Sequence, residues 1–128
     1  MSWGRSSLQS LGLKPGEAVD FVVRGRCMRV LKDGEGLRVR KQRWYVPGDV
    51  VVVRRRDYWD AHRFLGYAPS VHGALALTQA DDANERDPAA PLSAIVGRAH
   101  CRVAVSDRLA ALRKYARALI ARLEKMSR

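Results

Sequence analysis

The amino-acid sequence predicts a mainly β domain, in which a curled, mostly antiparallel sheet is followed by a C-terminal amphipathic α-helix. Short apolar runs with alternating or β-branched residues recur between residues 18 and 105, and glycine, proline or polar residues separate them. Short strands at this spacing are typical of curled antiparallel β-domains. A helical periodicity of apolar residues replaces this pattern from residue 106 onward.

The predicted strands follow one another through the middle of the chain. Val19 to Arg24 and Gly36 to Arg40 alternate or are rich in β-branched residues, and the valine run after Asp49 follows a Pro47-Gly48 turn, which is typical of a buried strand. The full set of predicted strands is 19–24, 36–40, 49–54, 61–66, 74–78 and 94–105. An acidic loop with two prolines, residues 79–91, separates the last two.

The chain divides into three segments by this pattern. Residues 1–16 form an N-terminal segment, in which Ser7 to Leu13 could make a short helix closed by Lys14-Pro15-Gly16. Residues 17–105 form the β-domain, and residues 106–128 form a basic amphipathic helix. A chain of 128 residues is long enough for one domain with a modest core.

The C-terminal helix carries an apolar seam. Ser106 is the predicted N-cap, and the helix continues to about Met126. The seam follows a 3-4 heptad spacing and consists of Leu109, Leu112, Ala116, Leu119, Leu123 and Met126. We expect it to pack against the β-domain. Homodimer formation through the seam and binding to a membrane surface are the alternatives.

Composition limits the classes of function. No run of 18 uncharged apolar residues occurs, and the N-terminus lacks the apolar core of a secretory signal, so we expect a soluble, cytoplasmic protein without a membrane span. Cys27 and Cys101 are too few for a disulfide framework. The net charge of +11 favours an anionic partner, of which a nucleic acid is one candidate, although most basic runs are solvated surface.

Cys27 is the strongest candidate for chemistry. It lies in Gly25-Arg26-Cys27-Met28, between a predicted strand and the turn at 32–34, and arginines flank it on both sides. Positive charge nearby favours the thiolate, which is the reactive form of cysteine. His62 is a candidate base for such a nucleophile, because imidazole titrates near neutral pH.

Four segments together resemble the signal peptidase and LexA-type serine peptidase superfamily. The stretch 25–35 resembles its nucleophile box "G-x-S-M-x-P-x-L-x-x-G-D", and 46–53 resembles its "G-D-V-V-V" strand. The stretch 61–64 resembles the "V-H-R-V" box of the archaeal and endoplasmic-reticulum-type signal peptidases. Finally, 78–99 resembles "T-K-G-D-A-N-x-x-x-D-P…I-V-G-R-V". Order and spacing agree over about residues 17 to 105.

The resemblance implies a LexA/signal-peptidase-like β fold and a nucleophile that works with a Lys or His base. No lysine lies in the strand after Asp49, and His62 occupies the place of the base. Asp87 matches the aspartate that would orient the imidazole, with Asp82 as the alternative. Met28 and Arg26, beside the nucleophile, would contact the substrate. No cofactor is implied, and no metal is expected, because the Cys and His residues lack zinc-ligand spacing.

The chain departs from the family pattern at three positions. Cys27 replaces the nucleophilic serine, Val30 replaces a proline, and Asp81 replaces the glycine before Asp82. A thiol needs less activation than a hydroxyl, so a Cys-His peptidase is chemically sensible. We therefore expect a soluble peptidase that cleaves a dedicated protein or peptide partner. The alternatives are a non-catalytic, peptide-binding pseudo-peptidase and a basic nucleic-acid-associated regulator.

Overall fold

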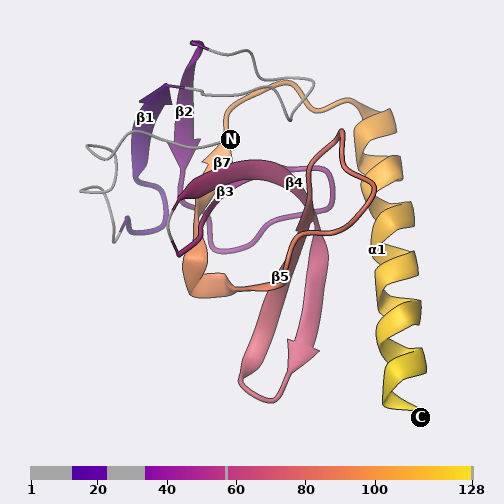
Figure 1. Ribbon diagram of the computed structural model, residues 1–128. Helices are drawn as coiled ribbons and strands as arrows, with labels where there is room; N and C mark the ends of the chain where they lie inside the picture. Colours follow the sequence, from indigo (N-terminus) through magenta and orange to yellow (C-terminus); the bar gives the residue numbers. More distant parts are fainter. Residues whose placement is uncertain (1–12, 23–33, 57, 128) are drawn as a thin grey trace.

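The computed structural model describes residues 13–22, 34–56 and 58–127, and in these residues seven antiparallel strands form one curled, half-barrel sheet (Figure 1). The strand order across the sheet is β1-β2-β7-β3-β4-β5-β6. The elements are β1 (Ala18–Val22), β2 (Gly36–Arg40), β3 (Val50–Arg54), β4 (Trp59–Ser70), β5 (Gly73–Gln79), β6 (Ala90–Pro91), a 3-10 turn η2 (Leu92–Ala94), β7 (Ile95–Ala99) and α1 (Val105–Met126). The predicted fold class, mainly β with a C-terminal helix, is confirmed.

The valine run of β3 is the centre of the sheet. Val50 to Val53 are all fully buried, because β3 lies between β7 and β4 and both of its faces are covered. Val50 and Val52 belong to one apolar cluster with Phe21 and Trp59, whereas Val51 and Val53 belong to another with Phe64. The uninterrupted apolar run, unlike an alternating one, correctly predicted a strand that is buried on both faces.

The strands β4 and β5 form a long hairpin that extends from the rest of the sheet (Figure 1). β4 begins at Trp59 and continues to Ser70, so it is longer than the predicted 61–66, and a register shift between Phe64 and Gly66 bends it. β7 ends at Ala99 and does not reach residue 105 as predicted. After the backbone N–H of His100 donates to the carbonyl of Arg38, the chain leaves the sheet for the helix.

The C-terminal helix starts one residue before the predicted N-cap. Ala104 is the N-cap, so the prediction for Ser106 is wrong. The carboxylate of Asp107, at the third position of the helix, accepts the backbone N–H of Ala104 at 3.0 Å, which is the half of a capping box that needs no hydroxyl at the N-cap. The predicted short helix at 7–13 falls almost wholly outside the described residues. In the described part of the chain, no helix has the length and apolar character needed to cross a membrane.

The helix packs on the sheet with a face different from the predicted one. Ala111, Ala118 and Tyr115 meet Leu65 and Leu77 of the hairpin, whereas Leu109 and Leu112 are nearly half exposed, at 48% and 47%. The prediction that the seam packs against the β-domain is therefore wrong. The two alanines let the helix approach the strands closely, and the ring of Tyr115 lies over Gly66, where a Cβ would collide with it.

Polar contacts fix the helix along its length. The carboxylate of Asp49 is buried, and its Oδ1 lies 3.1 Å from Nη1 of Arg108 near the start of α1. The hydroxyl of Tyr115 donates to the carbonyl of Tyr67, and Arg122 donates to the carbonyl of Pro69 at 3.2 Å. Two of these contacts join α1 to β4 of the hairpin, and the third joins the start of α1 to the residue before β3.

Candidate active site

His62 and Asp87 come together in the curl of the sheet. His62 lies in β4, opposite Val51 of β3, and Asp87 lies in the loop between β5 and β6. Nδ1 of His62 is 2.7 Å from Oδ2 of Asp87, and the two side chains are only 12% and 17% exposed. A carboxylate at this distance accepts the Nδ1–H and leaves Nε2 as the basic nitrogen of the neutral imidazole. This arrangement suits a general base.

Asp87 is itself held from several sides. The hydroxyl of Thr78 donates to Oδ2 of Asp87 at 2.7 Å, and the backbone N–H of Asp87 donates to the carbonyl of Thr78 at 2.9 Å. Burial acts to raise the pKa of Asp87, but hydrogen bonds from His62 and Thr78, together with the charges of His62 and Arg55, outweigh it and lower that pKa. Asp87 is thus an ionised acceptor near neutral pH, aimed at one nitrogen of His62.

Arg55 supplies a positive charge that sequence analysis missed. Its Nε donates to Asp60 at 2.9 Å, one Nη donates to Thr78 at 3.1 Å and lies 3.5 Å from Oδ2 of Asp87, and the other donates to the carbonyl of Pro88 at 2.9 Å. A basic run such as Arg54-Arg55-Arg56 is usually solvated surface. Arg54 and Arg56 are exposed, whereas the Arg55 side chain is only 12% exposed. Alternation at the end of a strand is the single signal that separates it from its neighbours.

Asp60 completes a compact charged group. Its Oδ1 lies 3.9 Å from Nδ1 of His62 and has no hydrogen-bond partner among the described residues. One donor atom each from Asp60, His62 and Asp87 lie within 4.8 Å of one another, so these three could hold a metal ion. However, Arg55 already pairs with both carboxylates. The positive charge that the carboxylates need is therefore present in the chain itself.

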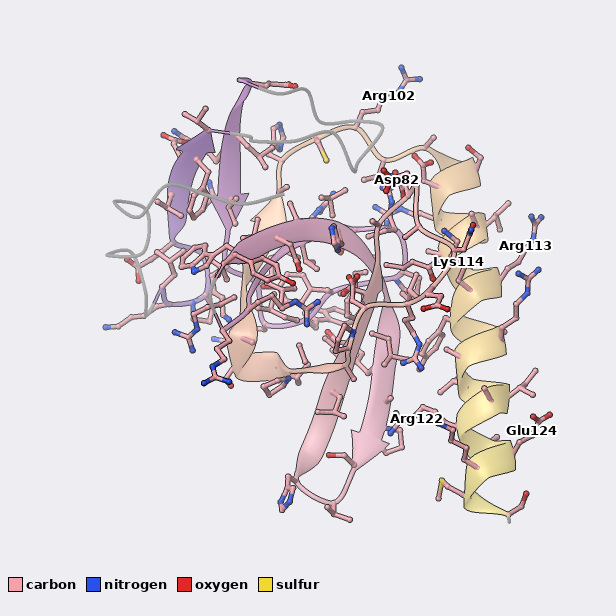
Figure 2. The ribbon with its side chains drawn as sticks, in the orientation of Figure 1. Asp82, Arg102, Arg113, Lys114, Arg122 and Glu124 are labelled. Atoms are coloured by element: carbon pink, nitrogen blue, oxygen red, sulfur yellow. The ribbon has the colours of Figure 1, made fainter. Side chains whose placement is uncertain are left out.

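The other predicted site residues separate into two groups. Cys27, Met28 and Arg26 lie outside the described residues, so the geometry between the thiol and the imidazole remains a prediction. Asp82, the alternative orienting residue, is an exposed loop residue (Figure 2). Asp87 makes the contact with His62. The structure thus favours Asp87.

Asp81 and Cys101 contribute to the fold through an ion pair and through apolar packing, respectively. Asp81, a departure from the family pattern, makes two contacts with Arg63, at 2.8 and 3.2 Å, and both side chains are almost fully buried. Cys101 is partly buried against the Phe21 cluster, and burial raises the pKa of its thiol. A thiol of that kind is poorly reactive near neutral pH.

A comparison of the chain with protein-family models, with curated proteins and with solved structures found no match. The functional argument consequently depends on the residues themselves. The contact between His62 and Asp87 joins two positions that the resemblance assigned to one catalytic unit. What this pair can do chemically is to accept a proton at Nε2 and to stabilise the imidazolium that results.

Proposed function

We propose that the protein is a signal-peptidase-like cysteine peptidase, with Cys27 as the nucleophile, His62 as the base and Asp87 as the residue that orients the imidazole. The observation that carries the proposal is the 2.7 Å contact between His62 and Asp87. These residues were selected from separate sequence motifs, and the fold brings them into hydrogen-bond distance. Thr78 and Arg55 support the proposal, because they hold the Asp87 carboxylate in place.

In this proposal, His62 takes the proton of the Cys27 thiol at Nε2, and the thiolate attacks the carbonyl carbon of the scissile peptide. Backbone N–H groups around Cys27 hold the oxyanion that forms. The imidazolium then donates its proton to the leaving amine, so the C–N bond breaks and a thioester remains. A water molecule, deprotonated by His62, hydrolyses the thioester and restores the thiol. Asp87 stays ionised throughout and stabilises the imidazolium.

The proposed substrate is a dedicated protein or peptide partner, cleaved in the cytoplasm. An extended segment would bind along a strand edge, with Met28 and Arg26 as contacts beside the nucleophile. Extended binding suits a β-sheet enzyme because the backbone of the substrate can pair with an exposed strand.

The test uses Cys101 as an internal control. In the folded protein at neutral pH, iodoacetamide should alkylate Cys27 at least about tenfold faster than Cys101, because a nearby imidazole favours the Cys27 thiolate while burial opposes that of Cys101. Peptide mapping by mass spectrometry resolves the two sites. His62→Ala should slow the labelling of Cys27 without changing that of Cys101. Equal rates at the two cysteines in the folded protein would refute the proposal.

A pseudo-peptidase is the second candidate. The replacement of the family's serine by Cys27 and of its proline by Val30 favours a domain that binds a peptide without cleaving it. The two candidates differ in the behaviour of Cys27→Ala. This variant should fold normally and fail to replace the parent protein in cells if the protein is a peptidase, and it should replace the parent fully if binding alone is required.

A further inference from the structure

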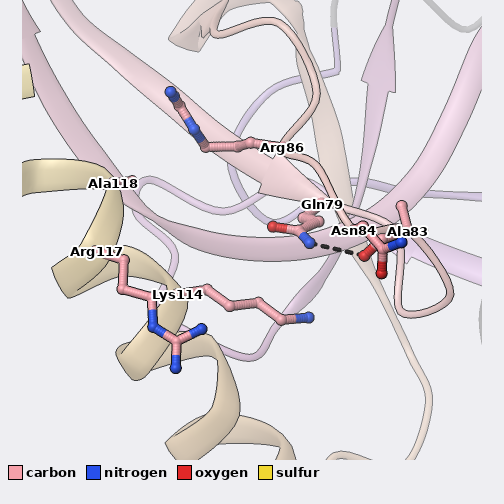
Figure 3. Close-up of a pocket in the computed structure, with 7 residues that line it drawn as sticks. All are labelled: Gln79, Ala83, Asn84, Arg86, Lys114, Arg117 and Ala118. Atoms are coloured by element: carbon pink, nitrogen blue, oxygen red, sulfur yellow. Dashed lines mark hydrogen bonds between the residues drawn. The ribbon is translucent and has the colours of Figure 1, made fainter. Parts of the chain in front are cut away.

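Two pockets adjoin along one side of α1, where the helix meets the loop between β5 and β6. The first has a volume of about 340 Å³ and is lined by Gln79, Ala83, Asn84, Arg86, Lys114, Arg117 and Ala118 (Figure 3). The second has a volume of about 230 Å³ and is lined by Arg86, Ala121, Arg122 and Lys125. Arg86 lines both, so the two pockets are neighbours along the helix, and we call the pair the basic groove.

The charge of the basic groove is of one sign. Among the described residues that line it, none carries a carboxylate, and the five charged ones are all basic: Arg86, Lys114, Arg117, Arg122 and Lys125. Other cations of the described chain are matched internally, such as Arg63 by Asp81 and Arg55 by Asp60. Within residues 13–22, 34–56 and 58–127, no ion pair involves any of the five groove cations. The groove therefore presents positive charge that an external anion can neutralise.

The basic groove lies on the side of α1 that faces the sheet. Lys114 and Arg122 point from α1 toward the sheet, whereas Arg113 and Glu124 point away from it (Figure 2). Cations thus lie on both sides of α1, and the two pockets are on the side that faces the sheet. A ligand in the groove can contact several cations at once, while Arg113 on the open side offers a single charge.

The lining of the groove favours a polypeptide. Its small side chains, Ala83, Ala118 and Ala121, leave room for an extended backbone, and the amides of Gln79 and Asn84 can bond a peptide group. The Gln79 amide donates to the carbonyl of Ala83 at 2.8 Å and keeps an oxygen available (Figure 3). No aromatic side chain lines the groove in the described residues, whereas single-stranded nucleic acids need such side chains for stacking.

Residues next to each other in the chain link the basic groove to the candidate active site. Thr78 and Asp87 contact each other beside His62. Gln79, which follows Thr78, and Arg86, which precedes Asp87, line the groove. Consecutive residues of a strand point to opposite faces, and Thr78 and Gln79 are consecutive in β5. A partner bound in the groove would therefore lie behind the site and would leave His62 accessible.

We propose that the basic groove docks an acidic segment of the polypeptide partner, at a site separate from the one that is cleaved. This inference rests on the proposed function, because it names the chemistry by which a dedicated substrate is selected. Acidic side chains pair with Arg86, Lys114 and Arg117 in the first pocket and with Arg122 and Lys125 in the second. A substrate so tethered presents its scissile segment at a raised effective concentration.

The experiment measures binding without turnover. A fluorescein-labelled oligoglutamate peptide is titrated with the full-length Cys27→Ala protein, and fluorescence anisotropy reports the Kd. The groove variant carries Lys114→Ser and Arg117→Ser, and the matched control carries Arg102→Ser and Arg113→Ser, which remove the same charge from exposed positions outside the groove. The groove variant should raise the Kd about tenfold and the control less than about twofold.

Each outcome decides the inference. Equal weakening in both variants would show that net charge alone binds the peptide, and absence of binding by the parent would show that the groove docks no acidic segment; either result overturns the proposal. Tighter, groove-dependent binding of a single-stranded oligonucleotide would overturn it in favour of nucleic acid. Failure of Cys27 to label would remove the peptidase and leave this binding intact, so the two proposals fail separately.

Discussion

Nδ1 of His62 lies 2.7 Å from Oδ2 of Asp87, although 25 residues separate them in the chain. The contact joins β4, which is fixed by pairing on both sides, to a loop that is fixed by Thr78 and Arg55. The loop therefore has several anchors besides the imidazole. In the proposed mechanism, this redundancy lets His62 change its protonation without losing its orientation.

In Asp87→Asn, the free energy of unfolding should change less than in the parent protein as the pH is lowered from 7 to 3. The pKa of Asp87 is lower in the folded protein than in the unfolded chain, so its carboxylate stabilises the fold fully above its ordinary pKa of about 3.9. That contribution disappears as the pH falls through the lowered value. The variant should lose about 2 kcal/mol near pH 7, and the difference from the parent should shrink toward pH 3. Urea unfolding across this pH range checks it; a constant difference would contradict it.

Asp81→Ala should destabilise the protein strongly. Removing this carboxylate leaves the guanidinium of Arg63 buried, and among the described residues the carbonyl of Gly48, at 2.8 Å, is the hydrogen-bond acceptor that remains. Breaking a buried pair from one side costs about 3 to 5 kcal/mol. Asp20→Ala is the control, because the pair of Asp20 with Arg38 is exposed and should leave the free energy of unfolding close to that of the parent. Similar losses in the two variants would contradict the prediction.

Gly66→Ala should loosen the helix from the hairpin. A methyl group at this position collides with the ring of Tyr115, and the hydrogen bond from that ring to Tyr67 depends on the close approach. Overpacking of this kind costs about 1 to 3 kcal/mol. Gly36→Ala is the matched control, since a Cβ there meets nothing within 4 Å. Thermal unfolding monitored by circular dichroism should show a lower Tm for Gly66→Ala alone.

The sequence predicted those features that depend on local pattern. The buried valines of β3, the strand at Gly36 to Arg40 and the existence of a C-terminal helix all follow from periodicity and turn residues. The pair of His62 and Asp87 could be predicted only because motif order limited the choice to a few acidic residues. Only strand alternation separates Arg55 from Arg54 and Arg56, and that weak signal does not show which acidic residues it pairs with, because Asp60 and Asp87 are brought to it by the fold.

The face of the helix was not predictable from the helix alone. Its heptad of large apolar residues is a stronger pattern than the alanines at 111 and 118, which make the actual contact. The sheet determines which face packs: Gly66 in β4 leaves space for Tyr115, and buried Asp49, just before β3, pairs with Arg108. Such tertiary selection of a less apolar face is invisible to a hydrophobicity pattern.

The exposed seam should associate with a second copy of the chain. Leu109, Leu112, Leu123 and Met126 are 47% to 79% exposed in the single chain, and their heptad spacing suits a two-helix contact. Leu112→Glu places a charge in the seam and should convert a dimer to a monomer, as measured by light scattering after size exclusion. Ala121→Glu, exposed on another side of α1, should leave the mass unchanged.

Because Arg113 flanks the seam, salt should strengthen the association of the parent by screening repulsion between the two copies. A parent protein that is monomeric at the highest concentration and salt would show that no second copy covers the seam.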